Sequence, residues 1–378
     1  MYNVLIMVDT SRASGRKFLI GVEKYVAAFA DWQVFVRPPD YLVDDTDESW
    51  YRLKEMNGIL VRDGHKKLNL SKISKPKVIN DTQREFVPGT STVITDSEKI
   101  GEMAAEYFLE LGFKHFAYCG FVEFHWSKKR FLSYTAALHK RGIENIYEYN
   151  YYPNLRNRKI TEHWKISQWL KELPSPLCVF ACNDDRAVSI LEACKVAQLN
   201  VPEQVAVLGV DNDELICNLS KPQLSSIELD FEKSGFKAAQ QLNDLMQKKI
   251  EQKIIYVTPL EVIQRRSTDI LAIEDENVAT ALIFIRNNFS KPIQVLDVVN
   301  STCLSRRELE KRFKVALNKT IKDEIDRMRI QLIQKKLLNS TNSISQIASE
   351  LEFTDIEHFS RYFKNLTGQS PSEFRHGM

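Results

Sequence analysis

The fold of the C-terminal part of the chain is decided by SRRELEKRFKVAL, residues 305–317. Its apolar residues Leu309, Phe313 and Ala316 recur at spacings of four and three, which predicts a short amphipathic helix with one buried face. Ser305 suits the N-cap position, because its hydroxyl can accept a hydrogen bond from a backbone N–H of the first turn. The opposite face is charged and stays available to contact another molecule.

The same pattern returns fifty positions later in DIEHFSRYFKNL, residues 355–366. Phe359, Phe363 and Leu366 form the apolar stripe of this second helix. Each helix follows a shorter apolar segment after a turn-length gap. These segments are residues 295–299 and 344–351. The sequence therefore predicts two helix-turn-helix motifs.

The free faces of both helices carry charged groups at matching positions. A packed core needs only the apolar stripe, so this recurrence favours a charged partner over the alternative of two solvated faces in a helical bundle. Residues 306–314 hold five basic and two acidic side chains, a local net charge of +3, whereas the whole chain carries only +2. Such a local cluster suits the phosphates of DNA.

Residues 278–375 resemble the AraC-type DNA-binding domain. The resemblance rests on Ala348, the Phe353–Thr354–Asp355 turn, Phe359, Phe363, Gly368–Gln369–Ser370–Pro371 and Phe374–Arg375. Glu352 departs from the family, which usually has glycine there, and a left-handed backbone would cost a non-glycine residue free energy. Family position implies base-edge contacts and phosphate contacts. The base-contact candidates are Arg307, Glu310, Lys311, Glu357, Ser360 and Arg361, and the phosphate-contact candidates are Lys314 and Lys364.

Residues 320–338 predict a longer helix with an apolar stripe. The stripe consists of Ile321, Ile325, Met328 and Leu332. About 19 residues at about 1.5 Å each give a rod of about 28 Å, which can hold two recognition helices near the roughly 34 Å separation of adjacent major-groove faces. A further helix is predicted at residues 274–288. Residues 263–273, which lead into it, are too short and apolar for a loose tether, so we expect an ordered connection there.

Length and composition indicate a multidomain globular protein. The 378 residues exceed what one hydrophobic core usually serves, and 43% of them are hydrophobic and 27% charged. The six cysteines lack zinc-site spacing, and no leader resembles a secretory signal, so we expect reduced thiols, no metal and no cofactor. No apolar run approaches the roughly 18 to 20 residues that span a bilayer. We expect a cytoplasmic protein, nucleoid-associated when bound to DNA, with no membrane partner.

Short β-rich runs alternate with helical segments between residues 2 and 210. The predicted strands are residues 2–8, 32–36, 58–61, 77–80, 93–95, 116–119, 177–181 and 205–210. Helical segments such as 18–29, 98–111 and 186–198 separate several of them. This alternation predicts an α/β region built on parallel sheet.

Polar residues follow several of these strands, at the ends where such sheets bind small ligands. They are Asp9 and Arg16 after the first strand, Trp126 and Arg130 after 116–119, Asn183–Asp184 after 177–181, and Asp211–Asn212 after 205–210. Carboxylates, amides, guanidinium groups and an aromatic face together suit a polyhydroxylated sugar. A single Asp at a strand end is more often a helix cap or turn former, so the prediction depends on the recurrence.

Residues 1–265 look like the effector-binding domain of LacI-type regulators, a fold shared with periplasmic sugar-binding proteins. The segments that carry the resemblance are PSPLCVFACNDDRA, LNVPEQVAVLGVDNDEL and KPQLSSIELDFEKSGFKAA. It implies two lobes that clamp a ligand, with chain crossings near residues 95–98 and 231. The DNA-binding part follows this domain, and that order, with HWSKKRFLSY and VIQRRSTD, resembles the family of bacterial xylose operon regulators. The sugar contacts implied by the resemblance are Arg16, Trp126, Arg130, Asp184, Asp211 and Asn212.

We therefore expect an α/β, two-lobed periplasmic-binding-protein-like domain at 1–265, a junction at 266–276 and an all-α domain with two helix-turn-helix motifs at 277–378. The expected function is a homodimeric transcription activator that binds a double-stranded DNA operator and a pentose, D-xylose by resemblance, with RNA polymerase as a further partner. The alternatives are a repressor or dual regulator that responds to another sugar, a sugar-binding protein whose C-terminal part only dimerises it, and an enzyme with a DNA-binding module. No GxxxxGK[ST], GxSxG or HExxH motif supports the enzyme.

Overall fold

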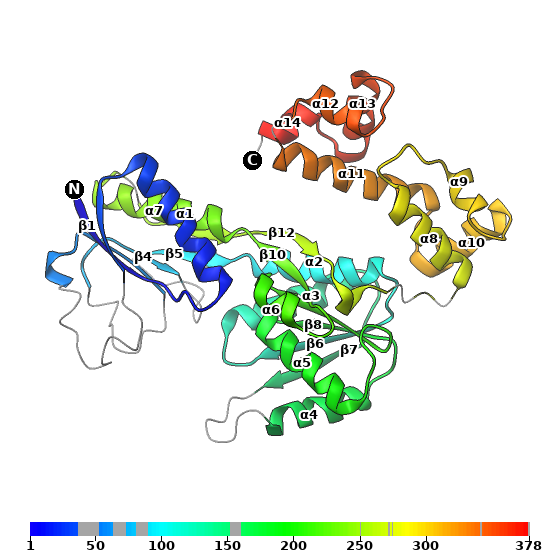
Figure 1. Cartoon of the computed structure of the whole chain (residues 1–378), viewed down its shortest axis with the longest axis horizontal. Helices are drawn as coiled ribbons and strands as arrows, with labels where there is room; N and C mark the ends of the chain where they lie inside the picture. Colours follow the sequence, from blue (N-terminus) through cyan, green and yellow to red (C-terminus); the bar gives the residue numbers. More distant parts are fainter. Residues whose placement is uncertain are drawn as a thin grey trace. The chain divides into compact units, whose positions relative to one another are not determined.

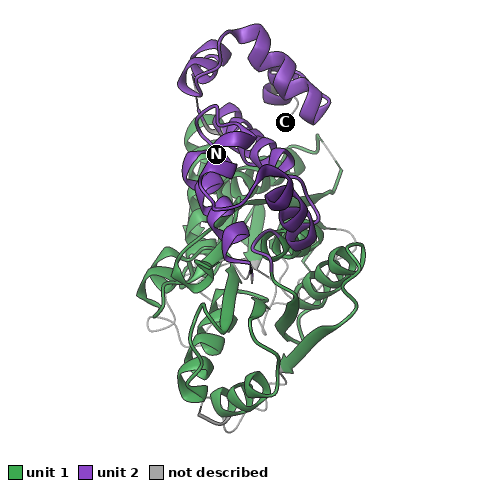
Figure 2. Cartoon of the chain, turned by 90° about the vertical axis from the view of Figure 1, so that its right-hand side faces the viewer, with its two compact units in different colours: residues 1–109, 113–270 green, residues 110–112, 271–378 purple. Residues whose placement is uncertain are grey.

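The computed structural model describes residues 1–36, 53–62, 73–80, 90–151, 160–249, 251–270, 273, 275–340 and 342–376. The chain forms two compact units (Figure 2). The first unit comprises residues 1–109 and 113–270, and the second comprises residues 110–112 and 271–378. The first is α/β and the second helical, as the sequence predicts.

The described residues of the first unit form two six-stranded sheets, one for each lobe. The first sheet has the order β11-β5-β4-β3-β1-β2, and its neighbouring strands run parallel. Its strands are β1 (Tyr2–Met7), β2 (Trp32–Val36), β3 (Gly58–Arg62), β4 (Lys77–Asn80), β5 (Ser91–Thr95) and β11 (Ile254–Val257). The helices of this lobe are α1 (Ala13–Phe29) and α7 (Phe231–Met246).

The second sheet has the order β12-β10-β9-β8-β6-β7. Its strands are β6 (His115–Phe121), β7 (Ile146–Tyr151), β8 (Leu177–Ala181), β9 (Val205–Val210), β10 (Ser225–Leu229) and β12 (Pro259–Ile263). The helices are α2 (Ser97–Glu110), α3 (His125–His139), α4 (Ile160–Lys171), α5 (Asp184–Ala197) and α6 (Glu214–Leu219). β12 pairs antiparallel with β10, so the expectation of a parallel sheet is wrong at this edge.

Within the described residues the chain passes between the lobes three times. Two passages, from β5 into α2 and from β10 into α7, lie where the sequence predicts them. The third was not predicted, and it occurs at Thr258, between β11 of the first sheet and β12 of the second. Each lobe is therefore built from separate stretches of the chain.

The helices α1 and α7 lie side by side in the first lobe (Figure 1). Two glycines allow their backbones to approach. A Cβ atom on Gly21 would lie 1.9 Å from the carbonyl oxygen of Glu232, and one on Gly235 would lie 1.9 Å from that of Phe18. Any side chain at either position would force the two helices apart.

The first part of the predicted junction is anchored to the second sheet. A short 3₁₀ turn covers Arg266–Thr268, and Ser267 and Thr268 are fully buried. The Ser267 hydroxyl donates a hydrogen bond to the carbonyl of Val207, at 2.6 Å. Residues 271, 272 and 274 of the junction lie outside the described residues.

The described part of the second unit is a chain of seven helices (Figure 1). They are α8 (Glu276–Asn288), α9 (Val295–Asn300), α10 (Arg306–Leu317), α11 (Ile321–Asn339), α12 (Ile344–Glu350), α13 (Ile356–Thr367) and α14 (Pro371–His376). The predicted helix-turn-helix motifs correspond to α9–α10 and α12–α13. Figure 1 shows α11 running from one helix-turn-helix group to the other.

Each helix-turn-helix motif has its own hydrophobic core. The first core contains Val278, Leu282, Ile285, Val298, Leu309, Phe313, Ile321 and Ile325, and the second contains Ile330, Ile333, Leu337, Ile347, Leu351, Phe359 and Phe363. Met328 and Leu332 are only partly buried, so the predicted stripe of α11 describes its first half better than its second. The prediction that Leu366 is part of a buried stripe is wrong, because 47% of its surface is exposed at the end of α13.

Glu352 has a φ of 55°, so the backbone is left-handed where the AraC-type family usually has glycine.

None of the described helices is long and apolar enough to cross a membrane.

Candidate effector site and nucleic-acid interface

A buried carboxyl lies at the carboxyl end of β8. Asp184 is only 3% exposed; its Oδ1 accepts a hydrogen bond from the Ser226 hydroxyl at 2.6 Å, and its Oδ2 accepts one from the backbone N–H of Asp213 at 2.8 Å. Gly209 leaves room for it, since a Cβ there would lie 2.3 Å from Oδ1. Burial, and then the charge of Asp211, raise the pKa of Asp184 to about 8. The carboxyl is thus mostly protonated at neutral pH and holds the loops after β8 and β9 together.

The residues that follow β9 have an unusual backbone. Asp211 and Asn212 have φ values of 108° and 46°. The backbone N–H of Asn212 donates to Ser226 Oγ at 3.0 Å, and its side-chain oxygen accepts a hydrogen bond from Arg265 at 2.9 Å. Backbone strain of this kind is typical of ligand clamps and costs of order 1–3 kcal/mol for each residue. The surrounding hydrogen bonds therefore keep this loop in a geometry that the chain would not choose alone.

An arginine and an aromatic cluster lie nearby on α3. The Arg130 Cζ is 4.8 Å from the centroid of the Trp126 ring, which stacks on Phe124 at a centroid distance of 5.5 Å. The guanidinium also donates to the backbone carbonyl of Cys182. Arg130 is 2% exposed, and its Nε has no hydrogen-bond partner among the described residues. A buried donor without an acceptor costs about 1–3 kcal/mol, so a polar ligand that accepts this hydrogen bond would bind favourably.

Arg16 is the predicted site residue of the first lobe. Its Nη1 donates to the carbonyl oxygens of Thr10 at 2.8 Å and Ser11 at 3.1 Å, so it braces the loop between β1 and α1. Within the described residues, none of its hydrogen bonds reaches the other five predicted site residues. The structure thus gathers five of the six at the carboxyl edge of the second sheet and places Arg16 on the other lobe.

Two contacts that the sequence analysis missed join the lobes at this edge. The Arg12 guanidinium forms an ion pair with Asp185 at 2.7 Å, and the backbone N–H of Ala13 donates to Asp213 Oδ2 at 2.9 Å. The acidic runs NDD and DND, which contain Asp185 and Asp213, are a signal that could have indicated them. Arg12 carries no comparable signal, because its partner lies 173 positions away.

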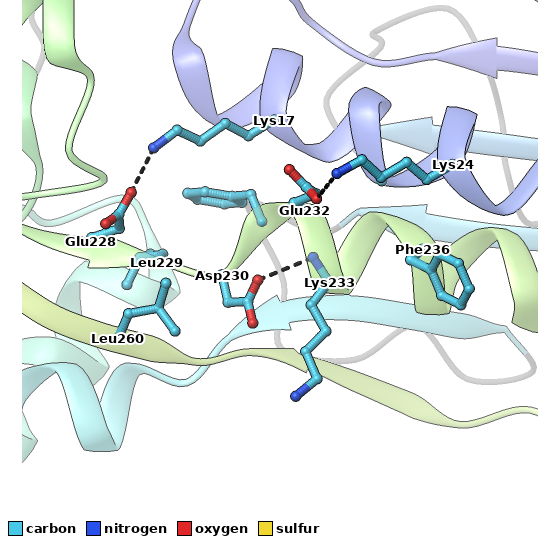
Figure 3. Close-up of a pocket in the computed structure, with 11 residues that line it drawn as sticks. Lys17, Lys24, Glu228, Leu229, Asp230, Glu232, Lys233, Phe236 and Leu260 are labelled. Atoms are coloured by element: carbon cyan, nitrogen blue, oxygen red, sulfur yellow. Dashed lines mark hydrogen bonds and ion pairs between the residues drawn. The ribbon is translucent and has the colours of Figure 1, made fainter. Parts of the chain in front are cut away.

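A pocket of about 470 Å³ lies between α1, the start of α7 and β12 (Figure 3). Its wall includes the ion pair of Lys17 with Glu228, at 2.8 Å, and that of Lys24 with Glu232, together with apolar groups such as Leu260. Carboxylates already neutralise these two lysines. We therefore place the candidate effector site at the strand ends of the second lobe and not in this pocket, which lies beside the passage from β10 into α7.

Side-chain caps start both predicted recognition helices. Ser305 Oγ accepts a hydrogen bond from the N–H of Glu308 at 3.4 Å, and Asp355 accepts one from the N–H of His358 at 2.6 Å. The backbone N–H of His358, with smaller effects from nearby groups, lowers the pKa of Asp355. The N-cap prediction at Ser305 is confirmed.

The ion pairs of α10 decide which of its basic groups remain available. Arg306 pairs with Glu310 at 3.0 Å, and Arg312 pairs with Glu308 at 2.6 Å. The exposed basic residues of α10 that form no ion pair within the described part of the chain are Arg307, Lys311 and Lys314. All three are predicted DNA-contact residues, whereas the predicted reader Glu310 is half-buried and held by Arg306.

The corresponding face of α13 is mainly exposed. Glu357, Arg361 and Lys364 are exposed, and Ser360 is half-buried. Ile356 borders this face with 46% of its surface exposed, and the sequence analysis missed it. An apolar side chain at such a place can contact the methyl group of thymine. This candidate interface therefore combines cationic and polar side chains with one exposed apolar side chain.

Comparison with known proteins identifies both parts of the chain. Residues 105–268 match the family model of a periplasmic binding protein-like domain, and residues 298–377 match that of a helix-turn-helix domain. The xylose operon regulatory protein of Haemophilus influenzae is 30% identical over 99% of this chain and 98% of its own length. That of Escherichia coli strain K12 is 28% identical over 99% and 97%. A solved xylose-binding transcription activator is 26% identical, with a TM-score of 0.62, and the match covers 99% of this chain and 97% of that one. The predicted fold class is confirmed.

Proposed function

Since the chain belongs to the family of xylose operon regulatory proteins, we propose that it activates transcription from a DNA operator in response to D-xylose. Its relatives are transcription regulators, and the helix-turn-helix domain makes this chain a DNA-binding regulator. The observation that best supports a sugar effector is the Arg130 guanidinium, buried over the Trp126 ring, with an Nε that lacks an acceptor among the described residues. A sugar offers a hydroxyl oxygen to the first group and a C–H face to the second.

We assign the effector-binding domain to residues 1–265, the junction to 266–276 and the DNA-binding domain to 277–378. Within the first domain, Arg16, Trp126, Arg130 and Asp211 are proposed to contact the sugar. Asp184 and Asn212 are proposed to support it mainly by positioning, because their oxygens already accept hydrogen bonds from the protein.

The two recognition helices are proposed to read adjacent major grooves. Arginine and lysine suit guanine O6 and N7, and glutamate can accept from cytosine N4. The proposed base readers are Arg307, Glu310, Lys311, Glu357, Ser360 and Arg361. Lys314 and Lys364 lie one turn further along their helices and are proposed to bind phosphate, which positions the helices without reading the sequence.

The sugar can act only by favouring one arrangement of the protein over another. The Arg12–Asp185 and Ala13–Asp213 contacts already link the lobes at the proposed site, so a ligand there would stabilise their closure. We propose that this closure reorients the DNA-binding domains of a homodimer in the cytoplasm, and that RNA polymerase is a further partner. We propose no enzymatic activity.

Calorimetric titration of the full-length protein with D-xylose, L-arabinose, D-ribose and D-glucose tests the effector. We expect saturable heat with D-xylose, and binding weakened roughly 10- to 150-fold in Arg130→Met, because a hydrogen bond to a charged group contributes about 1.5–3 kcal/mol. Asp211→Ala should abolish the heat. The matched control is Lys128→Met, an exposed cation on the same helix that should bind as the wild type does.

Gel shifts of the operator with and without D-xylose then test the regulation. Saturable heat with a sugar other than D-xylose would identify that sugar as the effector and leave the proposed mechanism in place. The absence of binding heat with all four sugars would refute the proposed sugar site, but it would not affect the assignment of the DNA-binding domain. Sugar binding that leaves the DNA affinity and the transcription of a reporter unchanged would refute the coupling.

A further inference from the structure

Arg329 lies on α11 at the boundary between the two hydrophobic cores of the second unit. Ile325, one turn before it, belongs to the core of the first helix-turn-helix motif, and Ile330 and Ile333 after it belong to the core of the second. Arg329 is only 7% exposed although it is charged. A side chain at this boundary can contact both motifs.

The Arg329 guanidinium makes one hydrogen bond to each side. Its Nη1 donates to the carbonyl oxygen of Lys291 at 2.6 Å, in the loop between α8 and α9. Its Nη2 donates to the carbonyl oxygen of Leu351 at 2.9 Å, at the end of α12. Its Cζ also lies 4.6 Å from the ring centroid of Phe353, in the turn that leads into α13. One planar group is therefore bound to the backbone of both motifs.

Stability alone explains this arrangement poorly. Burial disfavours the charge of Arg329 and lowers its pKa, and no ion pair of this residue is found in the described part of the chain. Apolar groups often stabilise a core as well as a buried charge does. A role in fixing the local geometry therefore explains the buried charge of Arg329 better than a gain in stability does. The guanidinium suits that task, because its donors are held in one rigid plane.

We propose that Arg329 is the positioning residue that sets the orientation of α13 relative to α10, and hence the spacing of the two DNA sequences that they read. Half of α11 is a lever of roughly 14 Å, so a rotation of about 20° at the boundary between the two cores displaces its far end by roughly 5 Å. That displacement exceeds the 3.4 Å rise of one base pair. The inference rests on the proposed reading of DNA by both recognition helices.

A distance measurement without DNA tests directly whether Arg329 fixes the orientation of α13 relative to α10. Spin labels are placed on Val315→Cys of α10 and Leu366→Cys of α13, which are 82% and 47% exposed in the wild type. Cys303 is replaced by serine, because it is exposed while the other five cysteines are buried. Pulsed electron resonance should give a narrow distance distribution with Arg329 and a broader one with Arg329→Lys, whose single ammonium cannot reproduce the planar fork. The matched control is Lys319→Met, which removes an ion pair with Glu324 on the first-motif side of the boundary between the two cores and should leave the distribution narrow.

Selection from a pool of random duplex DNA tests the consequence for recognition. The wild type should enrich two half-sites at one spacing, and Arg329→Lys should enrich the same half-sites at several spacings. Insertion of one base pair between the half-sites should weaken wild-type binding at least about tenfold, and binding by Arg329→Lys less than about threefold. Arg329→Met, which keeps an apolar stem, serves as a second variant, and circular dichroism verifies that both variants fold.

Two results would overturn the inference. One is an unchanged distance distribution in both variants, and the other is a single retained spacing with the wild-type penalty for the inserted base pair. A wild-type chain that enriches no sequence at all would instead refute the reading of DNA by these helices, even if the distance distribution broadens in the variants.

Discussion

Asp184→Asn should remove most of the pH dependence of the stability of the first unit between about pH 4 and pH 8. Burial and the charge of Asp211 raise the pKa of this carboxyl from 3.8 to about 8 in the folded chain. The folded state therefore binds the proton more tightly than the unfolded state does. The resulting stability is fully present below the unfolded pKa and is lost as the pH rises through the folded pKa. Each pKa unit corresponds to about 1.4 kcal/mol, so the wild-type free energy of unfolding should fall by roughly 4 kcal/mol between pH 5 and pH 8.

Asparagine preserves the local hydrogen bonding and does not titrate. Its oxygen can accept from the N–H of Asp213, and its NH₂ group can donate to the Ser226 hydroxyl. Urea unfolding at pH 5, 6, 7 and 8, followed by tryptophan fluorescence, measures the effect. All five tryptophans precede residue 170, so the signal reports the first unit. The control is Glu192→Gln, which replaces an exposed carboxylate on the same helix. Its free energy of unfolding should fall with rising pH as that of the wild type does. The reasoning fails if wild-type stability is level or rises from pH 5 to pH 8, or if the Asp184 variant falls as steeply.

The remaining predictions concern backbone strain, helix packing and DNA reading. Glu352→Gly should raise the stability of the second unit by about 1 kcal/mol, because left-handed backbone costs a non-glycine residue about 1–2 kcal/mol. Ser349→Gly, on ordinary helical backbone, should lower it by a similar amount, and destabilisation by both changes in circular dichroism melts would contradict the strain argument. Gly21→Ala should destabilise the first unit by on the order of 3 kcal/mol, since its Cβ would lie 1.9 Å from a carbonyl of α7, and unchanged urea unfolding would disprove this. Arg361→Ala should weaken operator binding by about 1–3 kcal/mol and relax specificity at one base pair. Lys364→Ala should instead weaken binding to all sequences and reduce by about one the slope of log affinity against log salt concentration. Equal losses on operator and random DNA in gel shifts would show that Arg361 reads no base.

The helix-turn-helix motifs could be predicted because their signals are local. The spacing of Leu309 and Phe313, and the cap at Ser305, lie within one helix and need no knowledge of the remaining chain. The second half of α11 escaped prediction because a single stripe assumes a single core. Ile330 and Ile333 pack into a different core from Ile321, and for the same reason nothing in the sequence indicates that Arg329 is buried.

The candidate effector site was predictable in composition and less so in geometry. Asp184 and Asp211 were found as polar residues at strand ends, but the raised pKa of Asp184 depends on tertiary burial. The partner of Ala13 is 200 positions away, and local patterns carry no information about such a contact. The antiparallel pairing of β12 was missed for a similar reason, because its direction depends on the third passage of the chain between the lobes.

The three passages between the lobes also impose an order on synthesis. The ribosome delivers β1 to β5 first, but the sheet that they form lacks β11 until residue 257 has been made, and α1 lacks its partner α7 until residue 246. Residues 97–229 meanwhile supply β6 to β10 as one uninterrupted stretch. Nascent chains should therefore complete most of the second lobe while the first still exposes an apolar helix face, which is the kind of surface that chaperones bind. The helix-turn-helix motifs follow both lobes in the chain, so a growing chain gains its DNA-binding part only after the lobes have been made.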